Sequence, residues 1–263
     1  MPGAAWAMMR PMADPATDPT TEPAGSGARP ARPHHKLTED GRRMREVLTY
    51  SRRGNRFAPR QQEAWDAYAR LWWIPDEAVD DPGFSLAGCF GRTAPLIVEI
   101  GSGIGESTVT LASARPDHDV VAFEVWRPGV ADTLGRIGAA GLSNVRLLSV
   151  DAVWSMEHLV APDSLAALWT FFPDPWHKTK HQKRRLVAPP FARLAATRLA
   201  PGAEWRLATD WADYAEQMVE VLAAEPLLRG GVVERWPERP VTKFERKGIA
   251  AGRQITDLAY VRV

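Results

Sequence analysis

Short apolar runs alternate with helical stretches along most of this 263-residue chain, and this alternation constrains its fold more than any other feature. Strands buried on both faces read as near-continuous apolar runs, and parallel strands need helical crossovers between them. From Pro95 onward the pattern therefore predicts a doubly wound α/β domain with a mostly parallel sheet. The expected strands are residues 96–100, 119–124, 145–150, 165–172 and 204–209, and helices are expected at 105–114, 128–140 and 189–199.

Three further segments extend this pattern. Residues 59–73 (PRQQEAWDAYARLWW) place Trp65, Tyr68, Ala69 and Trp72 on one face of an amphipathic helix. Residues 210–224 repeat apolar side chains at helical spacing. The last apolar run, ITDLAYVRV, follows a long irregular stretch and is expected to return as an antiparallel edge strand.

The N-terminal region differs in composition from the rest. Residues 1–36 are rich in Pro, Ala, Thr and Gly, so we expect a disordered tail that buries too little surface to offset ordering entropy. A basic extension follows at 37–94 and leads into the domain at 95–263. Within it, residues 41–60 hold seven arginines against one glutamate, which suits either a solvated arm or an arm that contacts phosphates. Since the net charge is only +1, nucleic-acid affinity must come from such local patches.

Cysteine and hydropathy patterns indicate the compartment. Cys89 is the only cysteine, which excludes an intramolecular disulfide and fits a reducing cytoplasm. No window approaches a membrane span, and the apolar run at the start is too short for a signal peptide. His177 and His181 lack a third acidic or cysteine ligand, so no metal site is expected. We expect a cytoplasmic protein.

A glycine-rich turn, VEIGSGIGES, joins the first expected strand to the first helix. Gly101, Gly103 and Gly105 allow a tight turn and close approach of the backbone to a ligand. Dinucleotide enzymes also use such turns. Glu99 discriminates between a dinucleotide and a methyl donor. A carboxylate at this position repels a pyrophosphate but favours the ammonium and sulfonium of S-adenosylmethionine. Pairing of Glu99 with a nearby base is the structural alternative.

Two more acids end successive strands. Glu124 lies 19 residues beyond Gly105, where a carboxylate can accept both hydroxyls of a ribose. Asp151 suits either the adenine amino group or the N-cap of a helix that begins in AVWSME. With Glu99, these acids favour a methyl donor over a dinucleotide.

The segment TFFPDPWHKTKHQKRRL follows the fourth strand and borders the same crevice. Two prolines flank Asp174 and are expected to hold it and Phe172 in extended conformations, which suits a preorganised catalytic group. The prolines also suit a plain strand end. Trp176 is suited to stacking on a base or to packing. The cations fit a phosphate backbone: Lys178, Lys180, Lys183, Arg184 and Arg185.

Together, the motifs EIGSGIG, FFPDPWHK, HQKRR, ATDW and RPVTKFE resemble those of the bacterial tRNA (guanine-N7-)-methyltransferases. The resemblance runs from about Arg42 to Val263. It implies a class I methyltransferase fold, a Rossmann-like seven-stranded sheet with an antiparallel last strand. It also implies S-adenosylmethionine as donor and guanine 46, in the variable loop of tRNA, as target. Two departures are Ser102, where the family often has an aromatic residue, and Trp126, where it often has His.

The resemblance also implies roles for individual residues. Asp174 is the expected catalytic residue, and RNA contact is expected for Lys180 through Arg185. Donor binding is expected for Glu99, Gly101, Glu124, Asp151 and Asp174. Contacts to the tRNA or guanine are expected for Lys178, Asp210, Thr242, Lys243, Phe244 and Glu245.

Some assignments stay open in the sequence. Asp174, Asp210 or Glu245 suits the guanine N1–H and amino edge, and Asp210 equally suits the N-cap of a helix that begins at Trp211. Thr242 to Glu245 are otherwise readable as a surface loop. Rival functions are methylation of a small molecule or another RNA, a nicotinamide oxidoreductase, and an RNA-binding protein. The sequence leaves monomer or homodimer undecided.

Overall fold

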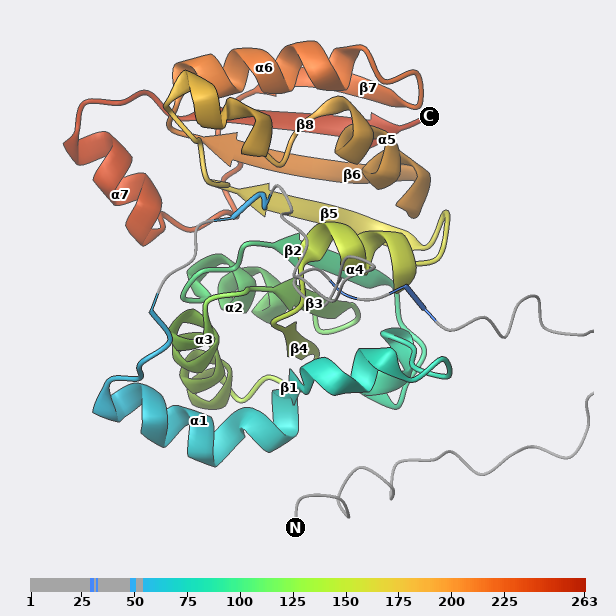
Figure 1. Ribbon diagram of the computed structural model, residues 1–263, viewed down its shortest axis with the longest axis vertical. Helices are drawn as coiled ribbons and strands as arrows, with labels where there is room; N and C mark the ends of the chain where they lie inside the picture. The colour runs from blue at the N-terminus through green and yellow to red at the C-terminus, as the bar shows by residue number, and fades with distance from the viewer. Residues whose placement is uncertain (1–28, 31, 33–47, 51–53) are drawn as a thin grey trace, which may run out of the picture.

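A computed structural model of the protein describes residues 29–30, 32, 48–50 and 54–263. It contains an eight-stranded sheet with helices on both faces (Figure 1). The strands are β1 (Trp73–Ile74), β2 (Leu96–Ile100), β3 (Asp119–Phe123), β4 (Val145–Leu148), β5 (Leu165–Phe171), β6 (Leu199–Thr209), β7 (Leu228–Val233) and β8 (Thr256–Arg262). The α-helices are α1 (Pro59–Trp72), α2 (Glu106–Ser113), α3 (Arg127–Ala140), α4 (Ala152–His158), α5 (Pro189–Arg198), α6 (Ala212–Ala223) and α7 (Lys243–Ala250).

The strand order is β1-β4-β3-β2-β5-β6-β8-β7. Pairs from β1 to β6 are parallel, whereas β8 runs antiparallel to both β6 and β7. This confirms the predicted fold class and the antiparallel direction of the last strand. The expected edge position of that strand is wrong, because β7 pairs with the far side of β8 and forms the edge itself. The sheet has one strand more than the expected seven because Trp73–Ile74 adds a two-residue parallel strand at the β4 edge, too short to show a periodic pattern.

The chain reverses its direction of strand addition between β2 and β5. From β2 it adds β3 and β4 on one side, and it then adds β5 and β6 on the other. In parallel sheets, ligands bind outside the carboxyl ends of the strands at such a switch point. Glu99 lies there, paired in register with Ala122 of β3 and Trp169 of β5.

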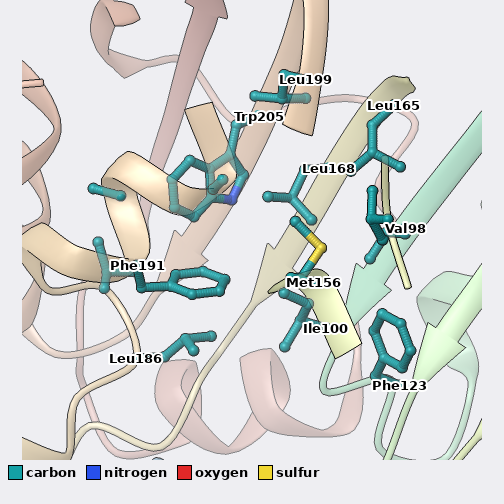
Figure 2. Packing of buried hydrophobic residues seen from close by; sticks show 14 of the residues in the cluster. Val98, Ile100, Phe123, Met156, Leu165, Leu168, Leu186, Phe191, Leu199 and Trp205 are labelled. Carbon is teal, nitrogen blue, oxygen red and sulfur yellow. The ribbon is translucent and has the colours of Figure 1, made fainter. Parts of the chain in front are cut away.

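Side chains that alternate along the strands form two hydrophobic layers. Val98 and Ile100 join the layer beneath α4, α5 and α6, whereas Ile97 joins the layer beneath α1, α2 and α3. In the first layer Trp205 packs edge-on against Phe191 of α5, with ring centroids 5.8 Å apart (Figure 2). Packing on both faces holds the parallel strands in register, so their carboxyl ends gather at one edge of the sheet, where the loops of the candidate site begin.

The short described part of the N-terminal tail contacts the domain through polar groups. Arg29 donates to the carbonyls of Val79, Asp81 and Phe84, and Arg32 pairs with Asp80 at 2.9 Å. Other residues of the tail expected at 1–36 lie outside the described ranges, as do arginines 42, 43, 45, 52 and 53 of the basic arm. In the described ranges, no helix is long and apolar enough to cross a membrane.

Candidate active site

The glycine-rich turn connects β2 to α2. All three of its glycines have positive φ: 80° at Gly101, 60° at Gly103 and 78° at Gly105. At Gly105 a Cβ would lie only 2.5 Å from the Thr133 side chain of α3, so both conformation and space require glycine there. The turn therefore leaves a tightly curved stretch of backbone at the switch point.

Glu124 holds this turn in place. One carboxylate oxygen accepts from the Gly103 N–H at 2.8 Å, and the other accepts from the Trp126 N–H at 2.7 Å. A carboxylate held in this way at the edge of the cleft presents acceptor oxygens of the kind that ribose hydroxyls require. The indole of Trp126 donates to the Gly54 carbonyl at 2.9 Å, which links this wall to the N-terminal extension.

Glu99 is buried at the end of β2. Its carboxylate accepts from the Thr108 hydroxyl at 2.5 Å, and no described base pairs with it, so the alternative of an ion pair is wrong within this part of the chain. Burial raises the pKa of Glu99 to about 7; the Thr108 hydrogen bond opposes this rise and the nearby Glu124 charge adds to it. A buried carboxylate poised near neutrality suits a cationic ligand group.

Asp151 caps α4. Its carboxylate accepts from the Trp154 N–H at 2.9 Å, so the N-cap interpretation is confirmed. Asp151 also lies between Val150 and Ala152, which both line the cleft described below. This capping hydrogen bond fixes the orientation of the Asp151 side chain beyond the end of β4.

Asp174 lies between two residues with left-handed backbone. Phe172 has a φ of 53° and Trp176 a φ of 45°. The expected extended conformation of Phe172 is therefore wrong. Its N–H still bonds to the Ala208 carbonyl at 2.7 Å, so the chain must turn away from the sheet at this residue. Non-glycine residues in this region cost about 1 kcal/mol or more each and concentrate at functional sites.

A cleft of about 830 Å³, counting its open mouth, lies at this end of the sheet. Glu124 and Asp174 line it together, along with Thr49 and Tyr50 of the N-terminal extension. A smaller recess adjoins it and shares Gly101, Phe172 and Phe244 with the cleft. Glu99 and Ser102 line the recess, and the Ser102 hydroxyl is buried with no partner in the described residues. Of the four predicted donor-binding acids, two thus line the cleft and Glu99 lines the recess, whereas Asp151 is flanked by cleft-lining residues but is not part of either lining.

The basic run divides into two groups. Lys178, Lys180 and Lys183 are exposed, and none of them has a partner among the described residues. They precede or lie in the 3-10 helix Thr179–Arg184. His181 lies in the same 3-10 helix, and its pKa is lowered, first by desolvation and then by the positive charges of the neighbouring cations. This group presents unneutralised positive charge to solvent.

Arg184 and Arg185 instead make hydrogen bonds within the protein. Arg185 is only 3% exposed and donates to the Pro175 carbonyl, Gln217 and Asp213, so it is not accessible for the expected RNA contact. Arg184 is half-buried and donates to two backbone carbonyls of the N-terminal extension. Sequence reasoning grouped all five cations because a run of letters does not show which side chains turn inward.

The aromatic residues of this segment are also used internally. The Trp176 indole donates to the Thr49 carbonyl at 3.0 Å, and the Arg184 guanidinium lies 3.5 Å from its ring centroid. Packing rather than base stacking therefore describes Trp176. His177 stacks on Trp211 at 5.5 Å. Among the described residues, no cluster of histidine, cysteine and acidic side chains could hold a metal.

Asp210 does not cap a helix. α6 begins at Ala212 with Trp211 as its N-cap and no side-chain cap, so the N-cap interpretation of Asp210 is wrong. The Asp210 carboxylate instead accepts from Arg253 at 2.8 Å and packs against Gly248 of α7. Asp210 lies outside the lining of the cleft and of the recess.

The TKFE motif begins a helix and is not a surface loop. Thr242 is the N-cap of α7 and accepts from the Glu245 N–H, a capping pattern readable in the sequence as Thr-x-x-Glu. Glu245 is 1% exposed, and its carboxylate accepts hydrogen bonds from Arg235 and Arg239. It is therefore not accessible for the expected guanine contact. Burial opposes its charge, but these arginines hold the pKa of Glu245 below its usual value.

The neighbouring residues of this motif face the hollow or the surface. Phe244 lines both the cleft and the recess, and its ring lies against Gly103. Lys243 is exposed, and its backbone N–H bonds to Glu106 at 2.5 Å. Thr242 also lines the recess, so Phe244 and Thr242 are the residues of this motif that reach the candidate site.

Sequence reasoning missed Thr49, Tyr50 and Arg239. The first two lie within the arginine-rich arm and show no periodicity, so only the fold reveals that they line the cleft. Arg239 is fully buried and bonds to both Glu245 and Asp257. The unusual sequence Arg-Pro before Thr-x-x-Glu was the available signal for it.

Known proteins provide independent comparisons. A family model described as "Putative methyltransferase" matches residues 93–258. A curated tRNA (guanine-N(7)-)-methyltransferase of Nocardioides sp. is 86% identical, covering 91% of this chain and 96% of its own. Another of Cutibacterium acnes is 49% identical, covering 83% and 84%. The solved 16S rRNA methyltransferase KamB shares the fold, with a TM-score of 0.51 at 17% identity over 68% of this chain and 95% of its own. The chain belongs to the tRNA (guanine-N(7)-)-methyltransferase family.

Proposed function

We propose that this chain transfers a methyl group from S-adenosylmethionine to N7 of guanine 46 in the variable loop of tRNA. The observation that carries the proposal is the gathering of Glu124 and Asp174 in one cleft, with Glu99 in the adjoining recess. The exposed lysines of the segment that follows Asp174 supply the charge for an RNA backbone. The activity in the names of the curated relatives supports the reaction, and the family resemblance supplies the guanine position.

The donor fits these acids group by group. Its ammonium suits the carboxylate of Glu99 in the recess, and its ribose hydroxyls suit the carboxylate of Glu124, which lines the cleft. The adenine amino group suits the Asp151 end of the cleft. Asp174, at the other side of the cleft lining, would favour the positive charge of the sulfonium. When bound, the donor supplies an activated methyl group.

The reaction needs positioning more than proton transfer. The N7 lone pair attacks the methyl carbon, the carbon–sulfur bond breaks, and sulfur keeps that electron pair. Positive charge therefore moves from sulfur to the guanine ring. A carboxylate at Asp174 can stabilise both the donor and the product cation, and its backbone between Phe172 and Trp176 holds it preorganised.

Phe244 and Asp174 are the residues proposed to receive the guanine. Phe244 is 38% exposed and lines the cleft, so its ring can stack on an extruded base. Asp174 is the carboxylate proposed for the guanine edge, because it lines the cleft, whereas Glu245 and Asp210 are not part of the lining of the cleft or of the recess. Lys178, Lys180 and Lys183 are proposed to contact the phosphates around it.

Incubation of the full chain with labelled S-adenosylmethionine and unmodified tRNA tests the proposal. Nucleoside analysis should recover 7-methylguanosine, and a tRNA with adenine at position 46 should accept no label. Asp174→Asn should lower kcat by about 100-fold or more because the preorganised charge is lost. Asp117→Asn, a change at an exposed acid remote in the chain from the site, is the control. Another methylated nucleoside, or none, would overturn the proposed function, and a near-normal rate for Asp174→Asn would remove Asp174 from the mechanism.

A further inference from the structure

Arg184 lies in a basic run but directs its guanidinium at the chain rather than at solvent. Its Nε donates to the Leu48 carbonyl at 2.7 Å, and one terminal nitrogen donates to the Tyr50 carbonyl at 2.9 Å. These contacts join residues 134 or more positions apart in sequence. A planar fork that meets two carbonyls at once is a specific arrangement that lysine cannot reproduce.

Trp176 strengthens the same attachment. Its indole N–H donates to the carbonyl of Thr49, the residue between the two that Arg184 holds. The Arg184 guanidinium also lies 3.5 Å from the Trp176 ring centroid, within range for a cation–π interaction. Three consecutive carbonyls, those of residues 48 to 50, are thus held by two side chains from the segment after Asp174.

The held residues form part of the cleft. Thr49 and Tyr50 line it with Glu124 and Asp174, and Leu48 is buried. Arg184 and Trp176 together donate one hydrogen bond to each of the three carbonyls of this wall, so removing either side chain weakens its attachment to the domain. Lys183, the neighbour of Arg184, is exposed and has no partner in the described residues. Lys183 thus faces solvent, whereas the adjacent Arg184 bonds to the backbone of residues 48 and 50.

We infer that Arg184 is a positioning residue for the methyl donor: with Trp176, it fixes residues 48–50 as a wall of the donor cleft. It acts through Thr49 and Tyr50 and does not contact the RNA phosphates. This inference rests on the proposed function for the identity of the donor. It assigns to Arg184 an effect on donor affinity, whereas the basic run suggested an effect on tRNA affinity.

Two measurements on the full chain separate these effects. The first is the Kd for S-adenosylhomocysteine, titrated calorimetrically without tRNA. The second is the dependence of KM for tRNA on salt concentration. Arg184→Ala should raise the Kd by about tenfold or more, since two charge-assisted hydrogen bonds are lost, and should leave the salt slope unchanged. Lys183→Ala should leave the Kd unchanged and reduce the salt slope by about 0.7 to 0.9.

Two further variants probe the geometry. Trp176→Phe keeps an aromatic ring but removes the indole N–H that bonds to the Thr49 carbonyl. This variant should therefore also raise the Kd for S-adenosylhomocysteine. Arg184→Lys should give a Kd between those of wild type and Arg184→Ala, because an ammonium cannot bridge both carbonyls in one plane. Trp176→Phe also keeps the test decisive if Arg184→Ala does not fold.

The outcomes are distinct. An unchanged Kd for Arg184→Ala and Trp176→Phe, with a reduced salt slope for Arg184→Ala, would overturn the inference and return Arg184 to the RNA-contacting set. A wild-type chain that binds no S-adenosylhomocysteine would instead overturn the proposed donor. A wild-type chain that binds it but methylates no tRNA would overturn the proposed substrate, while leaving the role of Arg184 measurable.

Discussion

At the scale of single residues, the surroundings of each acid separate roles that sequence letters cannot. Glu99 is buried and bonded to one hydroxyl, whereas Glu124 accepts from two backbone N–H groups. The two carboxylates therefore have different roles in this site. Glu99 is sensitive to pH near neutrality, and Glu124 fixes the glycine-rich turn.

The raised pKa of Glu99 predicts a pH-dependent affinity for the donor. Burial raises this pKa to about 7, so the carboxyl of the empty site is largely protonated below that pH. An ammonium group needs the ionised form, and its binding below pH 7 must release the Glu99 proton. The affinity for S-adenosylhomocysteine should therefore rise as the pH increases from about 6 to about 8 and then level off, as calorimetric titration would measure.

Two variants test the assignment of this pH dependence. Glu99→Gln should bind S-adenosylhomocysteine weakly and without an inflection near neutral pH. Thr108→Val removes the hydrogen bond that lowers the pKa of Glu99, so the inflection should move to higher pH. A wild-type profile that is flat between pH 6 and 8 would contradict the prediction. Glu99 also affects stability: since its folded-state pKa is raised, its contribution falls as pH increases from about 4.5 to about 7.

At the scale of elements, α7 depends on charges that are buried beneath it. Arg239 is fully buried, bonds to both Glu245 and Asp257, and lies 5.3 Å from the Phe172 ring centroid. These contacts tie the start of α7 to β8 and to the end of β5. They thereby place Phe244 over the glycine-rich turn.

This network predicts that Glu245→Gln destabilises the protein. Removal of one partner from a buried ion pair typically costs about 3 kcal/mol; because Arg239 keeps Asp257 as a second counter-ion, the loss here should be at most about that size. Denaturant unfolding should show this loss at pH 7, compared with the exposed α6 variant Glu216→Gln as control. The lowered pKa of Glu245 means that its stabilisation is present above about pH 4.5 and is lost as pH falls further. Normal stability with lost methylation would instead identify a guanine contact.

Elements with clear hydrophobic periodicity were predictable, and those held by particular contacts were not. The strands from 96 to 209 are buried by helices, so their apolar runs stood out. β7 reads LRGGVV, with both valines exposed, because it lies at the sheet edge. Its Gly230 approaches β8 so closely that a Cβ would lie 2.0 Å from the Ala259 carbonyl. Such close approach depends on the partner strand, which local sequence does not show.

The candidate site was predictable to a similar extent. Acids at strand ends were found because topology brings the carboxyl ends of parallel strands together. The inward turn of Arg184 and Arg185, and the approach of Thr49 and Tyr50, depend on contacts between distant segments. Glu245 was assigned to guanine because a motif does not reveal burial. The fold corrects these assignments without moving the site.

At the scale of the whole molecule, charge is balanced overall but concentrated locally. The chain has 33 basic and 32 acidic residues, so long-range attraction to RNA is weak. Lys178, Lys180 and Lys183 nevertheless form an exposed group without described partners, directly after the segment that carries Asp174. Affinity for tRNA should therefore depend on these few contacts and on salt concentration.

Simultaneous replacement of these three lysines by alanine should weaken tRNA binding and flatten its salt dependence. Each lost phosphate contact removes about 0.7 to 0.9 from the slope of log K against log salt, so the triple variant should lose about 2. Filter binding across a salt series would measure this, while the Kd for S-adenosylhomocysteine should stay at the wild-type value. Arg229→Ala is the control, because Arg229 is exposed and pairs in register with Val261, which pairs with Glu204 in the first half of β6, away from the carboxyl ends of the parallel strands. An equal loss of slope per replaced cation in both variants would mean that tRNA responds to net charge, and the lysine group would then lose its assignment as the RNA-contacting surface.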